Sequence, residues 1–399
     1  MTLDAASESF DFDEIVERRG TRCAKWDKME ALFGVSPEDG LAMWVADMDF
    51  RAPPPVRDAL ARAVEHGVFG YFGDDTAYKA AVSTWMRTRH GWEIEGDWLN
   101  TTHGLVAGTA LCVQAFSEPG DGVILFTPVY HAFHRVLTAN RRRIVSSPLA
   151  IRDGRHHMDL QALAARLDGS ERMVILCSPH NPGGRVWSAE ELRALAEFCA
   201  ERDLILVSDE IHADLVLPGG PAHTVANLAA PEHVDRIVTL MAATKTFNLA
   251  GAMTGGVFIE DPTLRARFQA VHQSVGASPN AMGMLMVTAA YEGGAPWLDA
   301  LRDYLDGNRR LFDEAVNAIP GLSSMHLDAT YLAWVDFSGT GMDREEFTRR
   351  VEKEARIAVN HGPGFGLGGE TWLRFNLATP RARVAEAAER LAAAFADLQ

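Results

Sequence analysis

The sequence predicts an α/β fold in which helices cover both faces of a mostly parallel sheet (an α/β/α sandwich), with a smaller α/β domain beside it. At 399 residues the chain is longer than a single core of average size. From about Thr101 to Glu260, short apolar runs alternate with helical patterns, which is typical of parallel strands joined by helices. The segments on either side lack this alternation, so we assign them to the second domain.

Five apolar runs predict the buried strands of the large domain. They cover residues 122–128, 172–179, 204–210, 236–245 and 255–260. Helical patterns fill the gaps, and in one of them, residues 188–203, Ser188 and Glu191 have the spacing of a capping box. The motif RAPPPVRDAL, residues 51–60, predicts a helix that begins at a proline near the domain junction.

The smaller domain is predicted to combine both ends of the chain. The N-terminal segment is irregular, and the C-terminal segment mixes long charged helices with short strands at residues 330–337 and 371–378. We therefore expect three parts: residues 1–52 in the small domain, residues 53–290 as the large domain, and residues 291–399 as the rest of the small domain.

Composition excludes several classes of protein. A net charge of −16 disfavours nucleic acid, whose binding needs clustered basic residues. The acidic N-terminus, MTLDAASESFDFDEI, does not resemble a secretory signal, and no run approaches the roughly 18 apolar residues of a membrane span. The four cysteines are scattered without CxxC spacing, so we expect no metal site, no disulfide framework and a cytoplasmic location.

Lys245 is unusual in a chain with 33 arginines and five lysines. The other four, Lys25, Lys28, Lys79 and Lys353, lie in polar stretches that predict exposure to solvent. Lys245 instead ends an apolar run, which places its amine at the end of a buried strand.

Polar residues follow three of the predicted strands. Asn181 follows the apolar part of the second run (172–177), Asp209, Glu210 and His212 follow that of the third (204–208), and Thr244 and Lys245 follow that of the fourth (236–243). In open α/β sheets, ligands bind beyond the carboxyl ends of the strands. We therefore expect an amide, a carboxylate and an amine in one pocket.

Two further features complete the predicted site. Gly104 stands where the helical pattern of residues 101–116 begins, and a helix N-terminus suits a phosphate group. Tyr130 follows the first strand and offers an aromatic face. An amine, a carboxylate, an amide, an aromatic face and a phosphate site together describe a site for pyridoxal 5′-phosphate (PLP).

Each of these residues, taken alone, also has an ordinary structural interpretation. The alternatives are a strand-end lysine, a helix-capping acid, a turn asparagine, a glycine that permits helix packing, a core tyrosine and a buried structural histidine. Their order on successive strands favours the cofactor site.

Over nearly its whole length the chain resembles the fold-type I PLP enzymes of the aminotransferase class I/II superfamily. It is most similar to the cystathionine β-lyase, or C–S lyase, branch. The motifs that carry the resemblance are ERRGTRCAKWDKME, WVADMDF, PVYHAF, SPHNPGGRVWSAEEL, DEIHADL and KTFNLAG.

The resemblance implies a role for each residue around the cofactor ring. Lys245 would bind the cofactor as a Schiff base, Asp209 would pair with the ring nitrogen, Asn181 would bind the phenolic oxygen, and Tyr130 would stack on the ring. Lys245, Asp209 and Tyr130 form the expected catalytic set, and His212 is counted among the cofactor-binding residues.

The resemblance also implies a phosphate site and a second subunit. Backbone N–H groups of Gly104, Leu105 and Val106 would bind the phosphate, with the hydroxyl of Thr244. Tyr71 matches a tyrosine that relatives send to the phosphate of the neighbouring subunit, which implies a homodimer with shared sites.

The expected partner is a small amino-acid substrate. Arg374, in WLRFNLATPR, matches the arginine that binds the substrate α-carboxylate through paired hydrogen bonds. Tyr71 and Asn181 complete the expected substrate-binding set.

Five positions depart from the superfamily pattern or mark the branch. Ala242 replaces a common serine, and Met253 replaces the phosphate-binding arginine of aminotransferases, so the phosphate has fewer side-chain ligands. His212 replaces an aminotransferase tyrosine, as in the lyase branch. Asn360 and His361 are not the residues expected before Arg374 in a glycine-rich loop near the substrate, so the specificity is expected to be unusual.

The sequence therefore predicts a PLP-dependent C–S β-lyase that performs α,β-elimination on L-cystathionine or another L-cysteine S-conjugate. Three alternatives stay open at this point. They are an aminotransferase, a specialised biosynthetic lyase or decarboxylating deaminase that acts on a complex S-substituted cysteine, and a regulatory protein that keeps the fold without useful catalysis.

Overall fold

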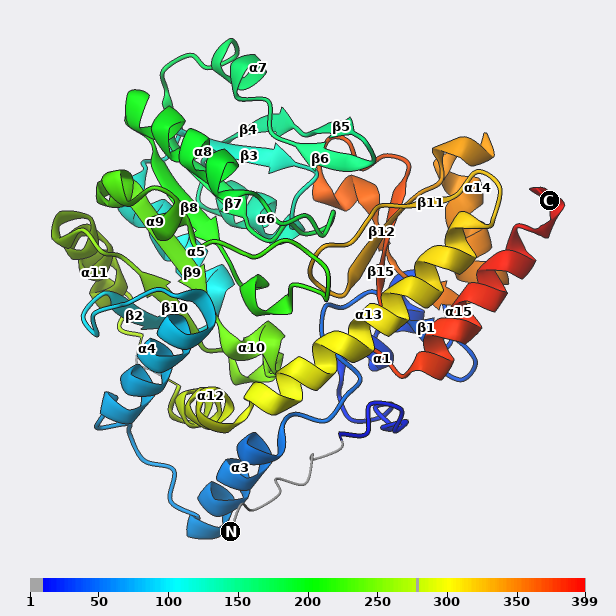
Figure 1. Cartoon of the computed structure of the whole chain (residues 1–399), viewed down its shortest axis with the longest axis horizontal. Coiled ribbons are helices and arrows are strands. Elements are labelled where there is room, and N and C mark those ends of the chain that lie inside the picture. The colour runs from blue at the N-terminus through cyan, green and yellow to red at the C-terminus, as the bar shows by residue number, and fades with distance from the viewer. Residues whose placement is uncertain (1–9, 278–279, 399) are drawn as a thin grey trace.

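A seven-stranded sheet forms the core of the larger part of the molecule, on the left in Figure 1. The computed structural model describes residues 10–277 and 280–398. Across the sheet the strands are β2 (Leu99–Thr102), β10 (Gly255–Phe258), β9 (Ile237–Met241), β8 (Ile205–Asp209), β7 (Glu171–Cys177), β3 (Gly122–Thr127) and β4 (Arg143–Pro148). Strand β10 alone runs in the direction opposite to the other six strands. The predicted mostly parallel sheet is confirmed, and each of the five apolar runs contains one of its strands; the run 236–245 forms β9 and then enters the short helix α10 (Ala243–Thr246), which carries Lys245.

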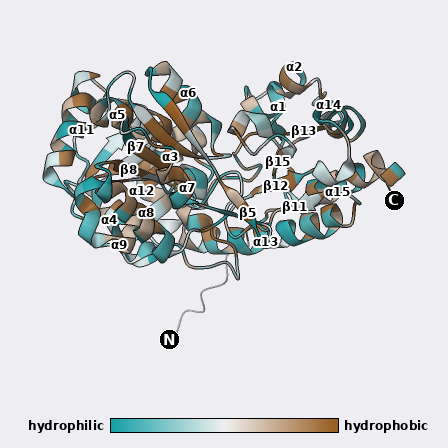
Figure 2. Cartoon of the chain, turned by 90° about the horizontal axis from the view of Figure 1, so that it is seen from above, coloured by the Kyte–Doolittle hydropathy of each residue, from teal (hydrophilic) through white to brown (hydrophobic). Residues whose placement is uncertain are grey.

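Helices cover both faces of this sheet. On one face lie α5 (Leu105–Phe116), α6 (His131–Ala139) and α11 (Pro262–Ser274), and on the other lie α8 (Ala189–Glu201) and α9 (Ala226–Ala229). Successive residues of β3 alternate between the two cores, since Val123 and Leu125 pack on the first face and Ile124 and Phe126 on the second. Figure 2 shows the hydrophobic strands β7 and β8 between the two helical layers.

Two predicted helix starts are confirmed. Helix α8 begins with a complete capping box, in which the Ser188 hydroxyl accepts from the Glu191 N–H and the Glu191 carboxylate accepts from the Ser188 N–H. Helix α3 (Pro54–His66) begins at a proline. It packs beside α12 (Ala281–Gly293), which also contacts α4 (Thr76–His90).

A smaller antiparallel sheet lies at the other end of the molecule. Its order is β11 (Ser323–Ser324), β12 (Leu332–Asp336), β15 (Trp372–Asn376) and β14 (Asn360–His361). Helices α13 (Ala295–Asn317), α14 (Arg344–Arg349) and α15 (Arg381–Ala394) pack beside it (Figure 1).

The N-terminal segment joins this smaller unit. Strand β1 (Leu41–Ala42) pairs in parallel with β13 (Ile357–Ala358), and Leu41 and Met43 share a core with the C-terminal helices. This pairing supports the predicted small domain, whose boundaries stay a prediction. The remaining α-helices and strands are α1 (Ala24–Asp27), α2 (Met29–Phe33), α7 (Leu160–Ala164), α10 (Ala243–Thr246), β5 (Ala150–Arg152) and β6 (Arg155–His157).

The expectation that Lys25 faces solvent is wrong. Its side chain is fully buried, and Nζ lies 3.0 Å from Oδ2 of Asp49. Local polarity misled the prediction because the partner that makes burial of a lysine possible lies 24 residues further along the chain.

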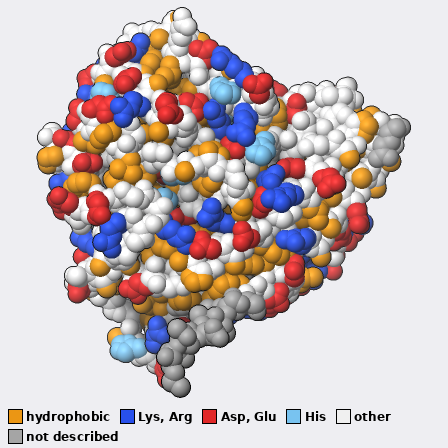
Figure 3. All heavy atoms as spheres, viewed as in Figure 1, with side chains coloured by type: hydrophobic (Ala, Val, Ile, Leu, Met, Phe, Trp, Pro, Cys, Tyr) orange, Lys and Arg blue, Asp and Glu red, His pale blue; other side chains and the backbone are white. Residues whose placement is uncertain are grey.

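The surface is mixed in charge on the face in Figure 3, where acidic and basic side chains are interspersed. Among residues 10–277 and 280–398, no helix is both long and apolar enough to cross a bilayer. The first nine residues of the N-terminal stretch discussed above lie outside the described residues.

Candidate active site

A cavity of about 540 Å³ opens at the carboxyl ends of β7, β8 and β9. It is lined by nine of the eleven predicted site residues: Lys245, Asp209, Asn181, Tyr130, Gly104, Leu105, Val106, Thr244 and His212. The two others are Arg374, which lies directly behind Asn181, and Tyr71, which is fully exposed elsewhere. The expected meeting of an amide, a carboxylate and an amine therefore occurs in the folded chain.

Lys245 lies on the short helix α10 at the wall of the cavity. Its Nζ donates a hydrogen bond to the carbonyl oxygen of Ala46. Burial lowers the pKa of Lys245 to about 8, and nearby Arg374 acts in the same direction, while Asp47 and Asp209 oppose the shift. A lowered pKa favours the neutral amine, which is the nucleophilic form.

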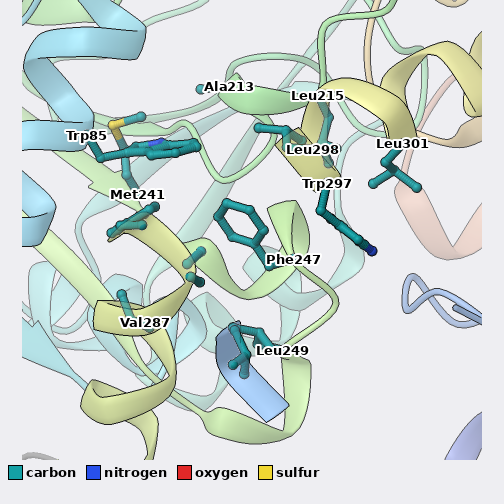
Figure 4. Close-up of a cluster of buried hydrophobic side chains, with 14 of the residues drawn as sticks. Trp85, Ala213, Leu215, Met241, Phe247, Leu249, Val287, Trp297, Leu298 and Leu301 are labelled. Atoms are coloured by element: carbon teal, nitrogen blue, oxygen red, sulfur yellow. The ribbon is translucent and has the colours of Figure 1, made fainter. Parts of the chain in front are cut away.

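A hydrophobic cluster fixes α10 from behind (Figure 4). The ring of Phe247 lies 5.4 Å from that of Trp85 and 6.1 Å from that of Trp297, measured between centroids. The Thr246 hydroxyl donates to Asp214 at 2.7 Å. These contacts hold the helix, so the Lys245 side chain extends from a rigid support.

The lowered pKa can be tested in the cofactor-free protein. We expect the labelling rate of Lys245 by an amine-specific reagent to reach half its maximum near pH 8, because burial disfavours the ammonium form. Nα-acetyl-lysine amide, with an ordinary pKa of about 10.4, is the reference. Mass spectrometry of the digested protein gives the rate at each pH, and a midpoint for Lys245 above pH 10 would contradict the prediction.

Asp209 ends β8 and is 5 % exposed. Burial raises its pKa to about 7, and the charge of Glu210 adds to the shift, whereas an N–H from Ile211 and the charge of Lys245 oppose it. No cation forms an ion pair with this carboxylate within the described part of the chain. A protonated ring nitrogen in the cavity would supply the missing positive partner, so Asp209 fits the cofactor predicted from the sequence.

His212 is a neutral histidine beside the cavity. Burial lowers its pKa to about 3, and Lys245 and Arg374 add to the shift. Its Nδ1 is buried without a hydrogen-bond partner among the residues described here. An orphaned ring nitrogen at a cavity wall is consistent with a ligand that completes the site.

Arg374 lies on β15, 2 % exposed, and is bound by neutral groups. Its guanidinium donates to Oδ1 of Asn181 at 2.8 Å, to Oδ1 of Asn360 at 2.6 Å and to the carbonyl oxygen of Trp44 at 3.0 Å. The guanidinium also lies 4.9 Å from the ring centroid of Phe365. The departure at Asn360 therefore has a structural role, which is to orient Arg374.

The charge of Arg374 is not balanced within residues 10–277 and 280–398, where no carboxylate pairs with it, and its Nε has no hydrogen-bond partner there. Burial lowers its pKa to about 10, which leaves it charged near neutral pH. A buried cation without an anion is a strong site for an incoming carboxylate. The other departure, His361, is different, because its ring binds Glu352 at 2.6 Å and is 42 % exposed.

The N-terminus of α5 forms the opposite end of the cavity. Gly104 precedes the helix with φ 79°, in the left-handed region that glycine adopts without strain, and the first-turn N–H groups of Leu105 and Val106 follow it. Thr244 contributes a hydroxyl to the same cavity, and Met253 lines it where aminotransferases have an arginine. The N–H of Gly104, expected to bind the phosphate, donates instead to the carbonyl oxygen of Thr102 at 2.9 Å. The first-turn N–H groups of Leu105 and Val106, together with the helix dipole, suit a phosphate here.

The family assignment rests on the match of residues 41–391 to the model of aminotransferase class I and II. This chain belongs to the aminotransferase class I and II family. Among its relatives, cystathionine beta-lyase PatB of Bacillus subtilis is 40 % identical over 386 residues, which cover 96 % of this chain and 99 % of PatB. Protein MalY of Escherichia coli is 32 % identical over 381 residues, 94 % of this chain and 96 % of MalY. The structure of cystalysin from Treponema denticola, which contains pyridoxal 5′-phosphate, has a TM-score of 0.93 and 34 % identity, and the match covers 98 % of this chain and all of that one.

Some residues that line the cavity of this aminotransferase class I and II family member were not predicted from the sequence. Arg135 on α6 and Cys177 at the end of β7 line it, and Ala46 contributes its carbonyl oxygen. Cys177 was detectable, because it ends a predicted strand as Asp209 does. Ala46 gave no signal, because an alanine that acts through its backbone has no distinctive side chain.

Proposed function

We propose that this chain is a PLP-dependent C–S β-lyase that cleaves L-cystathionine or another L-cysteine S-conjugate to a thiol, pyruvate and ammonia. The observation that carries the proposal is the arrangement of three groups: the Lys245 amine and the Asp209 carboxylate, which has no cationic partner among the described residues, line one cavity, and the unbalanced Arg374 cation is hydrogen-bonded to Asn181 in its wall. The names of PatB as a cystathionine β-lyase and of other relatives as C–S lyases support it.

The residues that would hold the cofactor divide by its parts. Lys245 would bind its aldehyde carbon, Asp209 its ring nitrogen, and Tyr130 the face of its ring. Oδ1 of Asn181 accepts from Arg374, which leaves the N–H donors of Asn181 for the phenolic oxygen. The backbone N–H groups at the start of α5 would bind the phosphate. When bound, PLP supplies an electron sink for the carbanion at the substrate Cα.

Two side chains would act directly on the substrate. Arg374 would bind the α-carboxylate with paired hydrogen bonds and so fix the orientation of Cα. Lys245, whose pKa burial lowers to about 8, would take the Cα proton as general base. The Cβ–S bond then breaks with departure of the thiolate, and the released aminoacrylate hydrolyses to pyruvate and ammonia.

Two close alternatives use the same residues. An aminotransferase would also need Lys245, Asp209 and Arg374, but His212 and Met253 stand where aminotransferases have a tyrosine and an arginine. A specialised lyase or decarboxylating deaminase would differ in the S-substituent that it accepts.

One assay separates these functions. The purified, cofactor-loaded protein is given L-cystathionine or S-methyl-L-cysteine, and thiol, pyruvate, carbon dioxide and amino transfer to 2-oxoglutarate are measured. We expect thiol and pyruvate in equal amounts without amino transfer. Amino transfer without thiol would identify an aminotransferase, and release of carbon dioxide would identify the deaminase.

The proposal includes a homodimer. The segment between α3 and α4 exposes four large apolar side chains, Val68, Phe69, Tyr71 and Phe72, and Val64 is exposed in the last turn of α3; Tyr71 is fully exposed. A second copy that covers this segment would remove the apolar surface from water. It would also bring Tyr71 to the phosphate of the neighbouring site, as the resemblance implies.

The proposed location is the cytoplasm. All four cysteines lie in the described residues and are free thiols, and three of them are buried. Free thiols are typical of proteins from reducing compartments.

A further inference from the structure

Residues 44–48, here called the strap, cross behind the site without forming a helix or strand. Backbone carbonyls in such a segment need partners from elsewhere. All five carbonyl oxygens of the strap accept hydrogen bonds from side chains. The donors are Arg374 to Trp44, Asn376 to Val45, Lys245 and Tyr331 to Ala46, Asn376 and Lys25 to Asp47, and Arg18 and Asn248 to Met48.

Arg374 binds the strap together with a neighbour on the same face of β15. Residues two apart in a strand point the same way, so Asn376 lies beside Arg374. Nδ2 of Asn376 donates to the carbonyl oxygens of Val45 at 2.5 Å and Asp47 at 2.6 Å. Arg374 binds the carbonyl oxygen of Trp44, next in the chain. Asn376 thus fixes the strap against the strand that carries the arginine.

Lys245 is tied to the strap in a similar way. Asn248, three residues after the lysine, donates through Nδ2 to the carbonyl oxygens of Met48 at 3.0 Å and Phe50 at 2.7 Å, and its Oδ1 accepts from the Met48 N–H at 2.9 Å. Lys245 itself binds the carbonyl oxygen of Ala46. One short segment therefore contacts both functional groups and both of their asparagine neighbours.

A buried ion cluster holds the other end of the strap. Asp49 accepts from Lys25 at 3.0 Å, from Arg18 at 2.8 Å and from the Trp26 indole at 3.1 Å, and Arg18 also binds Asp47 at 2.8 Å. Burial raises the pKa of Asp49, but Lys25 and Arg18 outweigh it and bring the pKa to about 2. The cluster stays charged near neutral pH, so the strap has little freedom to move.

We propose that Asn376 and Asn248 are positioning residues that set the separation between the Arg374 guanidinium and the Lys245 amine by fixing both to the strap. The inference rests on the proposed function, in which the arginine binds the α-carboxylate while the lysine meets the Cα proton of the same substrate. Because a misplacement of about 1 Å can cost about 10²-fold in rate, Asn376 and Asn248, neither of which lines the cavity, act on catalytic efficiency through the strap.

The test compares Asn376→Ala with a matched control, Asn308→Ala. Asn308 is also fully buried and also donates to two backbone carbonyls, those of Leu377 at 3.0 Å and Thr379 at 2.9 Å, but it does not contact the strap. Both variants should lose stability to a similar extent, measured as the unfolding temperature without cofactor. Only Asn376→Ala should raise KM for S-methyl-L-cysteine, with kcat/KM lowered about 10²-fold.

Binding without turnover gives a second readout. S-Methyl-α-methyl-L-cysteine has no Cα proton, and its dissociation constant follows from the change in cofactor absorption on titration. Asn376→Ala should weaken this binding about tenfold or more, as expected for loss of a residue that orients a binding group, and Asn308→Ala should leave it unchanged. Asn248→Ala should displace Lys245 and not Arg374, so it should lower kcat with little change in KM. This variant tests the proposal if Asn376→Ala does not fold.

The outcomes separate the two proposals. If the wild type releases thiol but Asn376→Ala binds the analogue as tightly as the wild type, or if Asn308→Ala weakens binding equally, the strap proposal is wrong. If the wild type releases no thiol yet binds the analogue in an Asn376-dependent way, the strap proposal stands and the lyase assignment fails.

Discussion

Replacement of Lys245 with alanine is expected to abolish thiol and pyruvate release. Loss of a general base alone costs about 10²- to 10⁴-fold. The same change removes the amine that would hold the cofactor, so the total effect is larger. Initial rates with L-cystathionine, measured at saturating cofactor, give the size of the loss.

The control for Lys245→Ala is Lys79→Ala. Lys79 lies on α4, pairs with Asp75 at 2.9 Å and has no part in the cavity. Its replacement should leave the rate unchanged. Borohydride reduction followed by peptide mass analysis should find the cofactor covalently attached at residue 245 in the wild type only. Near-normal pyruvate release from Lys245→Ala would overturn the proposed mechanism.

Replacement of Asp209 with asparagine is expected to lower turnover and, separately, to stabilise the cofactor-free protein at pH 8. Turnover should fall by about 10²- to 10³-fold, as for the loss of other preorganised electrostatic groups, because the ring nitrogen loses its anionic partner. Asp209→Ala should likewise lose most activity and keep its fold. Full activity in either variant would exclude the proposed role.

Although Asp209→Asn should lower turnover, it should raise the stability of the cofactor-free protein above that of the wild type at pH 8. The pKa of Asp209 is raised to about 7 in the folded state from an ordinary value near 3.9, so the folded protein binds the proton more tightly than the unfolded chain. Wild-type stability is therefore lost as pH rises from about 4 to 7 through this group. At pH 8 Asp209→Asn should unfold at a higher temperature than the wild type, and the difference should vanish near pH 4. Asp203→Asn removes a carboxylate from a fully exposed side chain and is the control variant for the same measurements.

The sequence was informative where chain order determines position in space. Asn181, Asp209 and Lys245 each follow a buried parallel strand, and such strands end at the same edge of a sheet, so their meeting could be predicted. The capping box of α8 was equally predictable because its bonds join residues three apart. The motif for Arg374 identified its position by resemblance, although two of its three neutral partners, Asn181 and Trp44, lie 193 and 330 residues away.

The remainder of the site depends on long-range contacts between backbone and side chains. The strap acts through carbonyl oxygens that every residue has, and its donors lie up to 331 residues away. Lys25 shows the same limit, since a polar neighbourhood in sequence did not indicate a buried partner. Tyr71 differs again, because its expected role needs a second copy of the chain.

The hydrogen bond between Arg374 and Asn181 joins the small sheet to the large one, and it has a consequence for which compounds the enzyme rejects. A simple amine could reach the Lys245 side of the cavity, but it would leave the guanidinium without an anion. An α-amino acid carries its amino group and its carboxylate on one carbon atom, so it can engage the Lys245 side of the cavity and the Arg374 guanidinium at the same time. We therefore expect the enzyme to discriminate against decarboxylated amines because they leave the buried Arg374 guanidinium without an anionic partner, and not because of a steric barrier.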